Sequence, residues 1–77
     1  MNQERRKMLQ EINDTIGGLI AQVEELLEQE NTAYDNLPES IQNSERGETM
    51  QSAIDNMGYL QSSLEEATGY IEEIFNT

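Results

Sequence analysis

Apolar residues in the first half of this chain recur at alternating steps of three and four, a spacing that places them along one side of an α-helix. A β-strand would require a period of two. The spacing therefore predicts one long helix, and it is interrupted only at Glu30. The series comprises Leu9, Ile12, Ile16, Leu19, Val23, Leu26, Ala33 and Leu37.

A second apolar line widens this side of the helix. Its members are spaced by seven residues and lie one position after the heptad line of Ile12, Leu19 and Leu26. Consecutive residues are about 100° apart around a helix, so the two lines together are wider than a two-stranded contact requires. We expect that a single partner helix leaves part of this side exposed to water. The second line consists of Ile20, Leu27 and Tyr34.

The second half of the chain repeats the pattern on two heptad lines. Ile54 and Phe75 widen the apolar side, and no residue from Glu45 to Asn76 forbids a continuous helix. This half is therefore predicted to form a second long helix that packs on the first. The two lines are Met50, Met57, Leu64 and Ile71, and Ala53, Leu60, Ala67 and Ile74.

The only proline, Pro38, lies between the two halves. It disfavours a helical conformation at Leu37 and suits the first turn of a new helix. Either Asn43 or Ser44 can cap the helix that follows. The residues that we assign to closing the turn are Asn36, Pro38, Ser44, Arg46 and Gly47.

Two helices of similar length joined by a short turn fold back as an antiparallel hairpin. The predicted helices cover about 3–36 and 44–76, the turn covers about 37–43, and residues 1–77 form one domain. A chain of 77 residues without cysteine buries little surface alone and forms no disulfide, so we expect oligomerisation. The predicted fold class is all-α: a coiled-coil-like helical hairpin that dimerises into a four-helix bundle.

A turn centred near residue 40 places positions whose numbers sum to about 80 side by side. Arg5 and Arg6 should then approach the carboxylates around Glu72. The same register sets Gly17-Gly18 opposite Ser62-Ser63. The two glycines either allow the helices to approach closely, or they bend the first helix or are simply tolerated in it, and the sequence leaves these explanations open.

The chain is strongly acidic. Sixteen Asp and Glu face four Lys and Arg, for a formal net charge of −12, and fifteen of the carboxylates follow residue 7, where Arg46 is the only cation. Such a surface favours a basic protein as partner and repels phosphates, so we expect no direct nucleic-acid binding. No apolar run approaches the twenty or so residues of a membrane span, so we expect a cytoplasmic protein without a membrane partner.

Common catalytic and metal-binding groups are scarce. The sequence lacks histidine and cysteine and has one lysine, Lys7, which removes the usual general base, the thiol nucleophile and most amine chemistry. It has neither the Glu-x-x-His pairs of di-iron bundles nor the acidic loop that binds calcium. We therefore predict a protein that is not an enzyme and that has no catalytic residue, no metal site and no cofactor.

Carboxylates and tyrosines off the main apolar side are the candidates for partner binding, because carboxylates suit a basic surface and tyrosines are favoured anchors at interfaces. A plainer reading is also open: the carboxylates form a solvated face, and the tyrosines cover the flank of the helix contact. The same carboxylates could also imitate nucleic acid along a rod about 50 Å long. The candidates are Glu24, Glu25, Glu28, Asp55, Tyr59, Glu65, Glu66 and Tyr70.

Residues 34–48 read YDNLPESIQNSERGE, with NQERRK at 2–7 and AIDN at 53–56. This pattern resembles small acidic helical proteins of bacteriophages and mobile elements, in which such a turn lies between two coiled-coil-like helices. The resemblance covers nearly the whole chain and implies a phage origin, but it supplies no mechanism. The chain departs from the family pattern at 57–59 (MGY) and 68–70 (TGY), where any specialised contact would lie.

Two functions are compatible with these features. The first hypothesis is a phage-encoded, non-catalytic interaction protein whose acidic surface binds and blocks a basic, nucleic-acid-handling protein in the cytoplasm of a bacterial host, as an anti-defence or anti-CRISPR inhibitor does. The alternative is a structural or assembly protein that self-associates or packs against another phage helix, with charge serving solubility only. The salt dependence of partner binding separates them.

Overall fold

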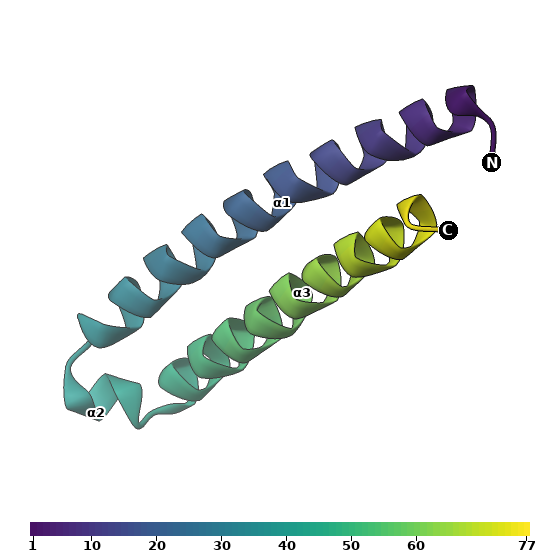
Figure 1. Cartoon of the computed structure of the whole chain (residues 1–77). Helices are drawn as coiled ribbons and strands as arrows, with labels where there is room; N and C mark the ends of the chain where they lie inside the picture. Colours follow the sequence, from purple (N-terminus) through teal and green to yellow (C-terminus); the bar gives the residue numbers. More distant parts are fainter.

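The computed structural model describes residues 1–77 as a helical hairpin (Figure 1). Helix α1 spans Gln3–Asp35, the short helix α2 spans Glu39–Gln42, and helix α3 spans Glu45–Phe75. In Figure 1, α1 and α3 run antiparallel and side by side, with α2 in the connection at one end and both termini at the other. The predicted all-α hairpin is confirmed, and α2 adds one helical turn within the connection.

The hairpin is a thin rod. It measures 58 × 15 × 14 Å and has a radius of gyration of 17.5 Å, whereas a globular chain of this length has a radius of about 11–12 Å. Each long helix therefore has a single long neighbour to cover its apolar side. None of the helices combines the length and the hydropathy that a membrane crossing requires.

Both long helices begin at side-chain caps, which accept hydrogen bonds from backbone N–H groups that lack partners in the first turn. The side chain of Asn2 accepts from the N–H of Arg5 at 2.8 Å, and the hydroxyl of Ser44 accepts from the N–H of Gly47 at 3.5 Å. Of the two caps that the sequence suggests for α3, Asn43 and Ser44, the structure uses Ser44.

The connection is held together by side-chain and steric contacts. Gln42 of α2 donates from Nε2 to the carbonyl oxygen of Tyr34 near the end of α1 at 3.0 Å, and the hydroxyl of Ser44 donates to the carbonyl oxygen of Ile41. Gly47 is buried against α2, and a Cβ at this position would overlap the carbonyl oxygen of Gln42. Glycine is required there because α3 passes too close to the α2 backbone to leave room for a side chain.

The other residues assigned to the turn play smaller parts. Asn36 ends α1: its backbone N–H donates to the carbonyl oxygen of Thr32, and the N–H of Leu37 donates to the carbonyl oxygen of Tyr34. Pro38 precedes α2 with φ of −56°, a value that its ring imposes and that suits a helix start. Arg46 is exposed in the first turn of α3 and makes no side-chain hydrogen bond.

The contact between α1 and α3 fully buries few side chains. Ile54 and Ile71 of α3 are the only buried hydrophobic residues, at 8% and 6% exposure. The remaining apolar residues of the contact are half-buried, because each helix is covered on one side only. They include Ile16, Ile20, Leu27, Met50, Met57 and Leu64.

The apolar side of each helix is wider than the contact, as its two lines predict. Leu19 is 42% exposed and Leu60 is 49% exposed. The contact instead takes in polar residues at half-buried positions, of which the sequence pattern indicated only Glu30. One of them, Asn13, has a buried side-chain oxygen without a hydrogen-bond partner. The others are Glu30, Gln61 and Thr68.

Gly17 and Gly18 do not bring the helices together. Both are exposed, and a Cβ built on either would have no neighbouring atom within 4 Å. The close approach to Ser62-Ser63 that the sequence allows is therefore not found. Helix α1 spans Gln3–Asp35 and continues through both glycines without interruption.

Candidate functional site: the two faces of the hairpin

Helix α1 has a line of half-buried residues with a different flank on either side. Successive residues are about 100° apart, so the residue before each member of the line and the residue after it lie on opposite sides of the contact. The line is Asn13, Ile20, Leu27 and Tyr34. The preceding flank is Ile12, Leu19, Leu26 and Ala33, and the following flank is Asp14, Ala21, Glu28 and Asp35. One flank of α1 is thus apolar and the other is largely acidic.

Helix α3 repeats this arrangement. Its line toward α1 is Ile54, Gln61, Thr68 and Phe75. The preceding flank is Ala53, Leu60, Ala67 and Ile74, and the following flank is Asp55, Ser62, Gly69 and Asn76. The preceding flank is again entirely apolar, and the following flank is entirely polar or glycine.

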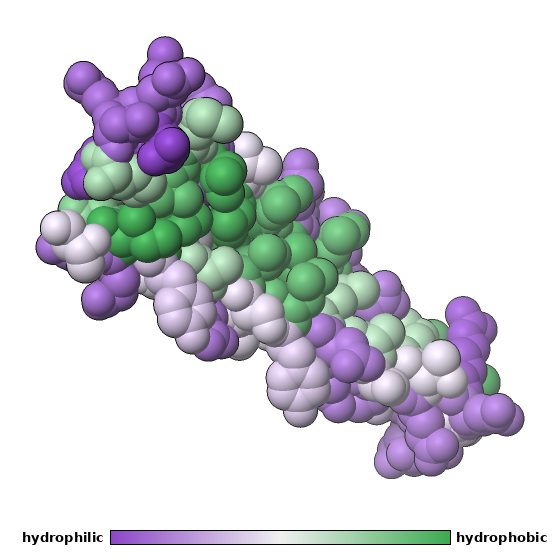
Figure 2. All heavy atoms as spheres, turned by 90° about the vertical axis from the view of Figure 1, so that its right-hand side faces the viewer, coloured by the Kyte–Doolittle hydropathy of each residue, from purple (hydrophilic) through white to green (hydrophobic).

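The two preceding flanks lie on the same side of the hairpin, because the helices are antiparallel and face each other. We call their eight residues the apolar face: Ile12, Leu19, Leu26, Ala33, Ala53, Leu60, Ala67 and Ile74. The five large side chains among them are 41% to 55% exposed. Figure 2 shows hydrophobic side chains gathered in a band along the rod. Exposed apolar bands of this kind are typical of interaction surfaces in soluble proteins.

The opposite side carries carboxylates. Glu24, Glu65 and Glu72 join the following flanks because each lies one helical turn from a member of those flanks. No cation occurs between Lys7 and Arg46 or after Arg46, so no nearby cation in the sequence neutralises the middle of this side. We call the exposed carboxylates on this side of the hairpin the acidic face: Asp14, Glu24, Glu28, Asp35, Asp55, Glu65 and Glu72.

The eight predicted partner-binding residues are all exposed, and the structure gathers them in two groups. The first group lines three adjoining grooves in the middle and turn-side part of the rod, and it consists of Glu24, Glu25, Glu28, Asp55 and Tyr59. The second group lies on α3 toward the open end, about 15 Å along the helix from Asp55. It consists of Glu65, Glu66 and Tyr70.

The two predicted tyrosines differ in their hydrogen bonds. Tyr59 is 70% exposed and Tyr70 is 64% exposed, so neither is buried against the helix contact. The hydroxyl of Tyr70 donates to the carboxylate of Glu66 at 3.1 Å. Asp55, which holds the equivalent position before Tyr59, instead accepts from Nε2 of Gln51 at 3.1 Å. The hydroxyl of Tyr59 thus lacks the carboxylate contact that Tyr70 has.

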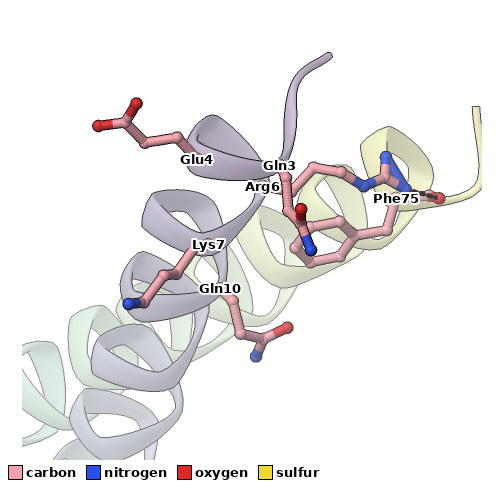
Figure 3. Close-up of a pocket in the computed structure, with 6 residues that line it drawn as sticks. All are labelled: Gln3, Glu4, Arg6, Lys7, Gln10 and Phe75. Atoms are coloured by element: carbon pink, nitrogen blue, oxygen red, sulfur yellow. Dashed lines mark hydrogen bonds between the residues drawn. The ribbon is translucent and has the colours of Figure 1, made fainter.

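The open end of the hairpin is closed by Arg6 (Figure 3). Its Nη2 donates to the carbonyl oxygen of Phe75 at 3.0 Å, and its Cζ lies 5.7 Å from the centroid of the Phe75 ring. Arg6 therefore lies beside the end of α3, as the predicted register requires. Its hydrogen-bond acceptor, however, is the backbone carbonyl oxygen of Phe75 rather than the carboxylate of Glu72. That carbonyl has no partner within its own helix. In Figure 3, Lys7 and Glu4 extend away from Phe75.

The carboxylates do not cluster tightly enough for metal chemistry. No group of three or more acidic residues is arranged to hold a metal ion. Comparisons with protein-family models, curated proteins and solved structures give no match to this chain. The candidate site is therefore defined by the geometry and charge of the two faces.

Proposed function

We propose that this chain is a non-catalytic interaction protein that pairs through its apolar face and presents its acidic face to a basic protein. The observation that carries the proposal is the position of the two faces on opposite sides of one hairpin. Two hairpins that meet through their apolar faces form a four-helix bundle with an acidic outer surface. Pairing and partner binding then use different residues and can occur together.

The size of the apolar face supports pairing with a second copy. The rod is 58 Å long and 15 Å wide, which gives a footprint on the order of 800–900 Å², close to the roughly 800 Å² per partner of a standard interface. Leu19 and Leu60 lie at about the same level near the middle of the rod, by the register that Arg6 and Phe75 define. Covering these leucines adds apolar burial that a single hairpin lacks.

The acidic face supports a basic partner. Its carboxylates are exposed, and complementary charge speeds encounter and selects among partners. Enzymes that handle nucleic acid have basic grooves for phosphates, so they form a natural target class. Occupying such a groove would make the chain an inhibitor of a bacterial host enzyme, in keeping with the phage-like turn at 34–48.

Two measurements test the two halves of this proposal. Sedimentation should show a dimer at about 0.05 M and at about 0.5 M NaCl, because salt does not weaken apolar contacts and it screens repulsion between acidic copies. Binding of a short arginine-rich peptide should weaken over the same salt range. The variant Glu24→Gln/Glu28→Gln/Asp55→Asn should stay dimeric and lose most peptide binding. A monomer at both salt concentrations, or full binding by the triple variant, would contradict the proposal.

A structural or assembly role is the second candidate, and the exposed apolar face favours it because that face also fits another helix. A host or phage partner that stays bound in about 1 M NaCl and is lost on Leu19→Asp would support this role. A partner that is released by moderate salt and lost in the triple charge variant would support binding through the acidic face.

A further inference from the structure

A groove opens between α1 and α3 on the side of the acidic face. Its volume is about 440 Å³, and the residues that line it include Leu27 and Asn31 of α1 and Ile54, Asp55, Gly58 and Tyr59 of α3. Gly58 is half-buried, yet a Cβ built on it would have no neighbouring atom within 4 Å. The groove therefore has room beside Gly58 that a larger side chain at this position would fill.

The lining of the groove combines three kinds of surface. Ile54 and Leu27 supply an apolar floor, since Ile54 is buried and Leu27 is half-buried. Asp55 supplies a carboxylate, whose one hydrogen bond comes from the neutral amide of Gln51. Tyr59 supplies an exposed aromatic ring. A ligand that matches all three has an apolar stem and a flat cationic end.

We propose that this groove holds the side chain of an arginine from the basic partner. The inference rests on the proposed function and specifies how the acidic face recognises that partner. The methylene groups of the arginine pack on Ile54 and Leu27. Its guanidinium donates to the carboxylate of Asp55 and stacks on the ring of Tyr59, while the side-chain oxygen of Asn31 is a further acceptor within the groove.

The surroundings favour a cation in this groove. Glu24 and Glu28 line an adjoining groove that shares Leu27 and Asn31 with it. The chain itself has no lysine or arginine on these segments to occupy the site. Arginine is preferred to lysine because its planar fork both stacks on an aromatic ring and pairs with a carboxylate, whereas an ammonium group is more strongly hydrated. The apolar face lies on the other side of the hairpin, so pairing leaves the groove open.

A second Gly-Tyr pair on α3 provides a built-in control. Gly69 and Tyr70 follow Glu66 with the same spacing that Gly58 and Tyr59 have after Asp55. There the carboxylate of Glu66 is already bonded to the hydroxyl of Tyr70, and Gly69 is exposed rather than half-buried. A carboxylate, a glycine and a tyrosine at the same spacing therefore occur without the groove.

The first test is titration of ¹⁵N-labelled protein with a blocked Gly-Arg-Gly peptide, followed by NMR, with Gly-Lys-Gly in parallel. The amide signals of Asn31, Gly58 and Tyr59 should shift on addition of the peptide. These shifts should saturate at a lower concentration of the arginine peptide than of the lysine peptide. Asp55→Asn should weaken arginine binding about fivefold. Glu66→Gln should weaken it less than twofold, because Glu66 lies outside the groove. Equal effects of the two substitutions would overturn the proposal.

The second test fills the groove without changing charge. Gly58→Leu should abolish the shifts caused by the arginine peptide, whereas Gly69→Leu should leave them intact, with circular dichroism confirming that both variants are helical. If Gly58→Leu binds the peptide as the native chain does, the groove is not the site, although binding through the acidic face stands. If the triple variant Glu24→Gln/Glu28→Gln/Asp55→Asn also retains binding, the proposed function fails as well.

Discussion

The apolar face and the acidic face are built on the same two helices and differ only in which neighbour of the buried line they present. Leu19 precedes Ile20 and lies on the apolar face, whereas Ala21 follows Ile20 and lies on the opposite side. In α3, Leu60 and Ser62 repeat this arrangement. A step of two residues moves a side chain about 200° around the helix, which separates the surface that we propose for a second copy from the surface that we propose for a partner.

The contact between α1 and α3, which lies between the two faces, should be the most sensitive to charge. Ile71 is 6% exposed in the helix contact, so Ile71→Asp places an unpaired charge there at a cost of about 3–5 kcal/mol. We expect loss of helicity at every protein concentration, measured by circular dichroism. The neighbouring substitution Tyr70→Asp, at an exposed position, should leave the helix content unchanged. Equal helicity of the two variants would show that the hairpin does not depend on the contact around Ile71.

The apolar face should be the next most sensitive, through association rather than folding of one hairpin. Leu19→Asp places a charge in the proposed interface of both copies and should weaken dimerisation on the order of 100-fold, measured by sedimentation equilibrium. Ala21→Asp is the matched control, because it adds the same charge on the other side of Ile20. If Leu19→Asp and Ala21→Asp associate equally well, the apolar face is not the dimer interface.

The connection between α1 and α3 sets how the two helices are aligned. A substitution at Gly47 tests the contact on which this connection depends. Gly47→Ala would push a methyl group into the carbonyl oxygen of Gln42, and the shift needed to relieve this overlap should destabilise the hairpin by about 2 kcal/mol in urea unfolding. Gly69→Ala, at an exposed helical site with open space, should stabilise it by up to about 1 kcal/mol. A stabilising effect at Gly47 would contradict the close contact between α2 and α3.

The smallest expected effect is at Asn13, whose side-chain oxygen is buried without a partner. Asn13→Leu removes this unpaired polar group and should stabilise the hairpin by about 1 kcal/mol. Thermal unfolding would show a higher midpoint, and sedimentation should show an unchanged dimer because Asn13 lies in the contact and not on the apolar face. A lower midpoint would indicate that Asn13 has a partner in the assembled protein.

Much of the fold could be predicted because it depends on local pattern. The three-four spacing, Pro38 and the Ser44 cap predict two long helices and the place where the chain turns. The contacts at the open end were harder to predict. The sequence suggests that Arg6 pairs with nearby carboxylates, whereas in the structure it donates a hydrogen bond to the carbonyl oxygen of Phe75. Charge alone does not identify a backbone acceptor, since every helix end has several.

The candidate site could be predicted only in part. Its residue types follow from composition and from their positions off the apolar side. That Asp55 and Tyr59 share a groove with Leu27, and that Glu66 and Tyr70 do not, depends on which part of α1 lies opposite. The open space beside Gly58 could likewise not be predicted, because Gly58 and Gly69 are both followed by a tyrosine and both lie three residues after a carboxylate.

By itself, the sequence determined that this protein forms two long amphipathic helices with an excess of carboxylates, because hydrophobic period and charge are properties of the chain read one residue at a time. Only the tertiary structure decided which half of each wide apolar side is buried. Two helices in contact can cover one strip each, so the more polar lines through Asn13 and Gln61 meet within the hairpin. Leu19 and Leu60 are left exposed for another surface to cover.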